Sequence, residues 1–176
     1  RGTTAGLLSL QQTLVRIARR VEPSVVAIAR YRLGDDTTPD PDHPDFIPSE
    51  YGTGIVVESP AAPDRRLILT CFHVVRGGPV TRRAGADNRR PSRLPPSGKS
   101  VPVGEERLHV RFSNRRGCPA RVLAADPRSD LAVLDLALDD LKQAGIDPKT
   151  LTPVSLAARP KPAKGQFVLL LGNPFA

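Results

Sequence analysis

The residues of this sequence best suited to chemistry are a histidine and an aspartate at the ends of two apolar runs. His73 follows the run at residues 67–72, and Asp130 precedes the run at residues 131–134. An imidazole can take up and return a proton near neutral pH, and a carboxylate on its other ring nitrogen fixes its tautomer. We predict that they act as a base and its orienting group if the fold brings the two strand ends together.

Each of these residues also has a structural interpretation. His73 lies in an apolar neighbourhood, where a lone histidine is more often a satisfied core side chain. Asp130 closes the segment at residues 127–130, whose Pro-Arg-Ser-Asp sequence is typical of a turn. His109 alternates with apolar neighbours and is interpreted as a strand residue on the polar face. Residue types alone therefore leave the role of the pair open.

Short β-rich runs separated by turn residues dominate the chain after Pro23, which favours an all-β antiparallel barrel or sandwich. Before them, apolar residues three and four apart predict an amphipathic helix over residues 6–20, which must end before the proline. We expect this basic helix to pack on the domain or on a partner subunit. A second helix is expected at residues 139–145. The expected strands are residues 24–30, 54–58, 66–71, 108–112, 121–124, 131–137 and, as a seventh, 166–171.

Two long loops of opposite charge interrupt the strands. The acidic loop at residues 34–50 contains His43, which we interpret as part of a solvated loop and not as a metal ligand. The loop at residues 76–104 carries much of the net charge of +8. Its many prolines and glycines favour a mobile loop over a nucleic-acid-binding face. Binding of anions or nucleic acid there is a weaker alternative.

The cysteines and the apolar runs indicate whether the chain has disulfides, a membrane span or a signal peptide. Cys71 and Cys118 are too few for a disulfide scaffold, and we interpret them as two small buried thiols on strands, with a disulfide as the alternative. No apolar run approaches the about 20 residues of a membrane span, and no signal peptide is visible. The chain contains no Met and begins with Arg1, which predicts a processed chain or an internal piece.

Five stretches, in the same order along the chain as in that family, resemble the trypsin-like domain of the HtrA (Deg) serine proteases of bacteria and organelles. The resemblance implies that His73 is the general base and Asp130 its orienting carboxylate, whereas Asp126 belongs to the motif but not to the triad. It implies a six-stranded barrel over residues 21–150 and the start of a second barrel at 151–176. No metal or organic cofactor is implied. The matching stretches are residues 21–28, 52–57, 69–75, 126–134 and 165–175.

The resemblance further implies a serine endopeptidase that hydrolyses unfolded or damaged proteins through an acyl-enzyme, in the bacterial periplasm or cell envelope. Together with the N-terminal helix it suggests a homotrimer. The glycine-rich turn that carries the nucleophile is expected after Phe175, so these 176 residues are expected to be inactive alone. The alternative is a non-catalytic pseudoprotease that binds proteins. Four serines of the chain do not lie in a glycine-rich turn and are therefore not interpreted as the nucleophile: Ser49, Ser59, Ser113 and Ser129.

Overall fold

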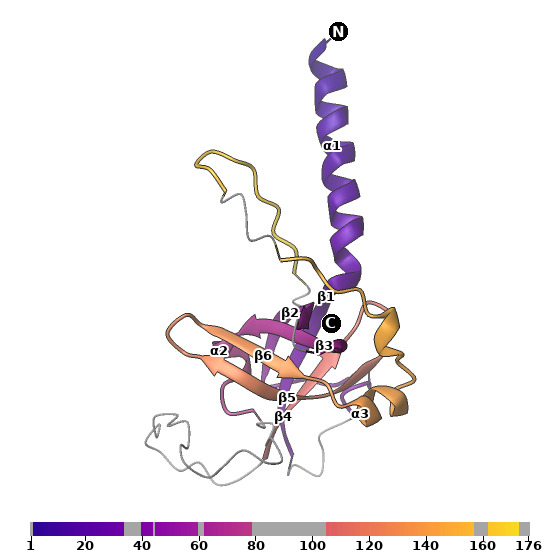
Figure 1. The fold of residues 1–176 in the computed structure, drawn as a ribbon, viewed down its shortest axis with the longest axis vertical. Helices are drawn as coiled ribbons and strands as arrows, with labels where there is room; N and C mark the ends of the chain where they lie inside the picture. The colour runs from indigo at the N-terminus through magenta and orange to yellow at the C-terminus, as the bar shows by residue number, and fades with distance from the viewer. Residues whose placement is uncertain are drawn as a thin grey trace.

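The computed structural model describes residues 2–33, 40–43, 45–59, 62–78, 105–156 and 162–172. Six antiparallel strands form a closed barrel in the order β1-β2-β3-β6-β5-β4 (Figure 1). The expected all-β class and six-stranded barrel are therefore confirmed. The strands are β1 Val25–Leu33, β2 Glu50–Ser59, β3 Ala62–Cys71, β4 Glu105–Arg111, β5 Gly117–Asp126 and β6 Leu131–Asp135.

The barrel interior is filled by alternate apolar side chains, as the pleat of a strand requires. Val26 and Ile28 of β1 and Ile68 of β3 are fully buried. The two valines of the short helix α2, Phe72–Val75, join the same core, and α2 contacts five strands of the barrel. Helix α2 therefore closes the interior directly after the end of β3.

Two further helical elements follow β6. They are the helix α3, Leu138–Gln143, and the 3₁₀ turn η2, Pro148–Thr150. Leu141 and Leu151 from this region are buried in the core cluster. The helix expected at residues 139–145 is therefore confirmed, shifted by one or two residues.

The N-terminal helix α1, Gly2–Val21, runs through the 3₁₀ turn η1, Glu22–Ser24, into β1 and projects away from the barrel (Figure 1). Its apolar stripe is exposed, with Leu7 at 64% and Leu10 at 43%. The expected helix is confirmed. It does not pack on this domain, because the helix axis leads away from the barrel, and the alternative of packing on a partner subunit stays a prediction. Among the described residues, no helix is both long and apolar enough to cross a membrane.

The C-terminal region differs from the prediction. Residues 166–172 form neither helix nor strand, so the expected strand at residues 166–171 is wrong for this structure. A strand is defined by backbone hydrogen bonds to a neighbouring strand. Among the described residues, the backbone bond of this run goes from the N–H of Gln166 to the carbonyl oxygen of Ala163, which is a turn contact and not a strand pairing. The division into a barrel unit at 21–150 and a second unit from 151 stays a prediction.

The loops and cysteines complete the comparison. Both Cys71 and Cys118 are free thiols at strand positions, as interpreted, but only Cys118 is buried; the expectation of a buried Cys71 is wrong, because Cys71 ends β3 at the rim of the barrel and is partly exposed. His43 lies in the exposed part of the acidic loop, with its side chain 53% exposed. The basic segment at residues 79–104 lies outside the described residues, so its expected mobility and anion binding stay predictions.

Candidate active site

The pairing of β3 with β6 brings His73 and Asp130 together. Cys71, the last residue of β3, lies opposite Leu131, the first residue of β6. One more backbone hydrogen bond extends this ladder, from the N–H of Phe72 to the carbonyl oxygen of Asp130 at 2.9 Å. The residue after β3 and the residue before β6 are therefore neighbours although they are far apart in sequence.

Both carboxylate oxygens of Asp130 contact His73. One oxygen accepts the backbone N–H of His73 at 2.9 Å, and the other lies 2.7 Å from the ring nitrogen Nδ1. Two contacts from one carboxylate fix the ring relative to its own backbone. Sequence reasoning predicted that these residues would meet, and the structure brings them together.

The turn that presents Asp130 is itself organised by an aspartate. The carboxylate of Asp126 accepts hydrogen bonds from the backbone N–H of Arg128 at 3.0 Å and from the hydroxyl of Ser129 at 2.8 Å. These bonds lower the pKa of the Asp126 carboxyl. Asp130 then adopts φ of 55°, a left-handed conformation that aspartate tolerates better than most residues. Asp126 therefore positions the turn and does not contact His73.

Two glycines of β2 let the neighbouring elements approach closely. A Cβ on Gly52 would overlap the side chain of Val74, the residue after His73, and a Cβ on Gly54 would overlap Ile68 of β3. Between β2 and β3, the hydroxyl of Thr70 donates to the carbonyl oxygen of Thr53 at 2.8 Å. The Gly-Thr-Gly sequence therefore seats α2, and with it His73, on the barrel end.

The Asp130 carboxylate fixes the tautomer of the neutral His73 ring. Hydrogen bonds from the His73 ring and backbone N–H lower the pKa of the Asp130 carboxyl. An ionised carboxylate only accepts hydrogen bonds, so Nδ1 of a neutral His73 carries the proton and Nε2 is left as a proton acceptor. The His73 side chain is 65% exposed, so a second group can approach the ring. This arrangement can accept a proton from a nucleophile and return it to a leaving group.

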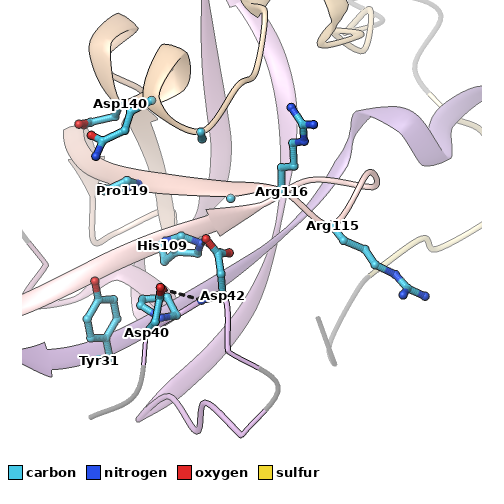
Figure 2. Close-up of a pocket in the computed structure, with 12 residues that line it drawn as sticks. Tyr31, Asp40, Asp42, His109, Arg115, Arg116, Pro119 and Asp140 are labelled. Carbon is cyan, nitrogen blue, oxygen red and sulfur yellow. Dashed lines mark hydrogen bonds and ion pairs between the residues drawn. The ribbon is translucent and has the colours of Figure 1, made fainter.

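A second histidine–aspartate pair lies on the outer surface of the barrel and was missed by sequence reasoning. Nε2 of His109 is 3.2 Å from a carboxylate oxygen of Asp42 (Figure 2), and the His109 side chain is only 7% exposed. The prediction that His109 is a strand residue facing away from the core is confirmed, because its neighbours Leu108 and Val110 face the core. His109 does point outward, but the acidic loop covers it and burial lowers the pKa of its imidazole.

Several contacts hold this loop on the barrel. The guanidinium of Arg111 donates to the carbonyl oxygen of Pro41 at 2.6 Å, and the rings of Tyr31 and Phe46 pack edge to face with centroids 5.4 Å apart. The loop borders a surface pocket of about 510 Å³ in which His109 and Asp42 lie beside each other (Figure 2). No signal in the sequence indicates this contact, because it depends on how the loop folds back.

One group of residues in the described part of the chain has the composition of a metal site. Its three candidate ligand atoms are the thiol sulfur of Cys71, one imidazole nitrogen of His73 and one carboxylate oxygen of Asp130. These atoms all lie within 4.8 Å of one another. The sequence analysis implied no metal, and this cluster was not predicted.

Comparison with known proteins supports one family. Residues 52–176, more than half of the chain, match the family described as "Trypsin-like peptidase domain". A segment of 72 residues is 36% identical to the "Probable periplasmic serine endoprotease DegP-like" of Marinomonas sp. (strain MWYL1). That segment covers 41% of this chain and 13% of the relative. The HtrA-type resemblance is therefore confirmed, and the chain belongs to the family of trypsin-like peptidase domains.

Proposed function

We propose that this chain supplies the general base, His73, and its orienting carboxylate, Asp130, to a serine endopeptidase of the HtrA type. The observation that carries the proposal is the double contact between one carboxylate and one histidine, at 2.9 Å to the backbone and 2.7 Å to the ring. A core histidine needs neither an oriented carboxylate nor a ring that is 65% exposed. Both features serve a base that must reach a substrate-bound nucleophile.

The proton path follows from this geometry. Nε2 of His73 takes the proton of a serine hydroxyl as the hydroxyl oxygen attacks the peptide carbonyl. Asp130 stays ionised and stabilises the imidazolium that forms. The imidazolium then gives its proton to the leaving amine, and a second cycle with water hydrolyses the acyl-enzyme. The nucleophile would come from outside the 176 residues, so these residues alone would be inactive.

Two of the described serines have hydroxyls that already donate hydrogen bonds to other groups. The hydroxyl of Ser129 donates to Asp126 at 2.8 Å, and the hydroxyl of Ser49 donates to the carbonyl oxygen of Arg30 at 2.8 Å. These contacts support a nucleophile from elsewhere in the full protein.

Substrate class, assembly and location rest on the resemblance. We propose that the full protein cleaves unfolded or damaged proteins, assembles as a homotrimer and acts in the periplasm or cell envelope. The name of the DegP-like relative supports an endoprotease and a periplasmic location, although that relative matches only over 72 residues.

A fluorophosphonate probe tests the proposal in the full-length protein, because it labels only a serine that a base has activated. We expect labelling of the wild type and none of His73→Ala. The matched control is His43→Ala, which removes an exposed histidine of the acidic loop and should keep the labelling. Circular dichroism must show that each variant is folded.

Two results would contradict the proposal. Labelling that survives in folded His73→Ala would mean that another group activates the nucleophile. Absence of labelling in the folded wild type would favour the non-catalytic protein-binding module, in which the pair has only a structural role.

A further inference from the structure

We propose that Cys71, His73 and Asp130 form a binding site for a zinc ion that holds the general base inactive. The three side chains meet at the end of β3, and their candidate donor atoms lie within 4.8 Å of one another. The consequence for catalysis rests on the proposed function of His73, whereas zinc binding itself does not.

The donor set is suited to zinc. A thiolate, an imidazole nitrogen and a carboxylate oxygen are its common protein ligands, and three of them leave a fourth tetrahedral position for water. Hard cations such as Mg²⁺ prefer all-oxygen sites, so the thiol selects against them. The ionised Cys71 and Asp130 together carry two negative charges, which neutralise one divalent cation.

The distances need only a small adjustment. Two ligand atoms on a tetrahedral zinc lie about 3.4 Å apart, given metal–ligand bonds of about 2.0–2.2 Å. Nδ1 of His73 and the nearest Asp130 oxygen are now 2.7 Å apart. Both side chains are substantially exposed, at 65% and 48%, so the pair has room to open by this amount.

The protons balance in either mode of binding. The thiol of Cys71 loses its proton to solvent as the thiolate binds the metal. If zinc binds Nδ1, the ring proton moves to Nε2, which becomes a donor and can no longer accept a proton from serine. If zinc binds Nε2, the metal occupies the basic lone pair directly. Zinc therefore blocks the general base whichever nitrogen it uses.

The position of Cys71 separates it from the other thiol. Cys71 is partly exposed at the barrel end, whereas Cys118 is 1% exposed within the core and burial raises the pKa of its thiol to about 12. Cys118 is thus unable to compete for the metal in the folded chain. It provides a matched control from the same molecule.

The experiment is a titration of this chain with Zn²⁺ against a chromophoric chelator. We expect one zinc ion per wild-type chain, and a loss of affinity of about 100-fold or more in Cys71→Ala, because even outer partners of a metal ligand contribute about 10–100-fold. Cys118→Ala should bind zinc as the wild type does. Titration with Co²⁺ should give a thiolate-to-metal charge-transfer band that Cys71→Ala lacks.

Other results would overturn the proposal. Zinc binding that is unchanged in Cys71→Ala would exclude the thiol as a ligand. Binding that is lost in His43→Ala would place the metal in the acidic loop instead. Absence of stoichiometric binding in the wild type would remove the site. None of these results depends on proteolysis, and fluorophosphonate labelling of the metal-free full-length protein tests the general base separately.

Discussion

Two histidine–aspartate pairs on one barrel have opposite settings. The ring of His73 is 65% exposed, and its carboxylate, Asp130, contacts it twice from a neighbouring strand end. The ring of His109 is 7% exposed, and its carboxylate, Asp42, contacts it once at 3.2 Å from a loop. The first arrangement orients an accessible base, whereas the second attaches a loop to the barrel surface.

The two pairs also differ in their pKa shifts. Around His109, burial opposes the charged form and outweighs the attraction of Asp42, so the pKa of the ring falls. At the exposed pair, the hydrogen bonds from His73 lower the pKa of the Asp130 carboxyl. A histidine–aspartate contact therefore indicates catalysis only when the ring is also oriented and accessible.

Removing the carboxylate from each pair should give the largest contrast. In the full-length protein, Asp130→Asn should lower kcat about 10⁴-fold, because an amide stabilises the wrong tautomer of the histidine. Asp42→Asn should lower kcat by less than about tenfold, because the Asp42 carboxylate contacts the buried His109 ring and the Arg111 guanidinium and not His73. Steady-state cleavage of an unfolded protein substrate measures both. A comparable loss in Asp42→Asn would mean that the acidic loop takes part in the active site.

Filling the space beside His109 should mainly affect stability. A Cβ on Gly117 would overlap Nε2 of His109, so Gly117→Ala should destabilise the barrel by about 1–3 kcal/mol. The double variant with His109→Ala should recover part of that loss, because the clash is gone. Urea denaturation measures the free energy of unfolding of each variant.

Gly6→Ala is the matched control for this substitution. Its Cβ would meet nothing within 4 Å on the exposed helix α1, so we expect no loss of stability. Equal losses in Gly6→Ala and Gly117→Ala would show that the effect comes from replacing glycine and not from the contact with His109.

The sequence predicts the exposed pair better than the buried one, for physical reasons. The positions of His73 and Asp130 follow from two strands whose apolar runs are visible locally. His109 alternates between Leu108 and Val110, which face the core, so its outward direction could also be predicted. Its burial could not, because that depends on Asp42, 67 residues away in a loop without a periodic pattern.

Two other differences between the sequence predictions and the structure have similar causes. The apolar run at residues 166–171 has strand propensity, but propensity alone forms no strand without a hydrogen-bonding neighbour. The amphipathic pattern of α1 predicts an apolar stripe, but it cannot indicate which surface, if any, covers it. Local patterns therefore predicted the elements, while contacts between distant segments had to come from the structure.

Stability should respond to pH in different ranges at the two pairs. The pKa of His109 is lower in the folded chain than its ordinary 6.5, so the unfolded chain takes up a proton first. The stabilising contribution of neutral His109 is thus complete above about pH 6.5 and is lost as the pH falls through the folded pKa. The contribution of Asp130, whose ordinary pKa is 3.8, is lost only at lower pH.

Urea denaturation between pH 7.5 and pH 5 separates the two contributions. His109→Gln should flatten the loss of stability across this range, because its side chain does not titrate. Asp130→Asn should keep the slope of the wild type. Identical slopes in the wild type and His109→Gln would show that the attraction of Asp42 and Asp40 offsets the effects of burial and Arg111 on the His109 pKa.

The smallest expected effect is in the labelling of the two thiols, one beside each pair. Cys71 adjoins the exposed pair, while Cys118 lies opposite Val110, next to His109, with its thiol 1% exposed and a pKa raised to about 12. A thiol reacts as its thiolate, so a disulfide reagent should modify Cys71 alone in the folded chain and both thiols in urea. Zinc should slow the modification of Cys71 without changing the reaction of Cys118 in urea. Modification of Cys118 at the rate of Cys71 in the folded chain would mean that the barrel opens beside His109, and that this pair is as accessible as the first.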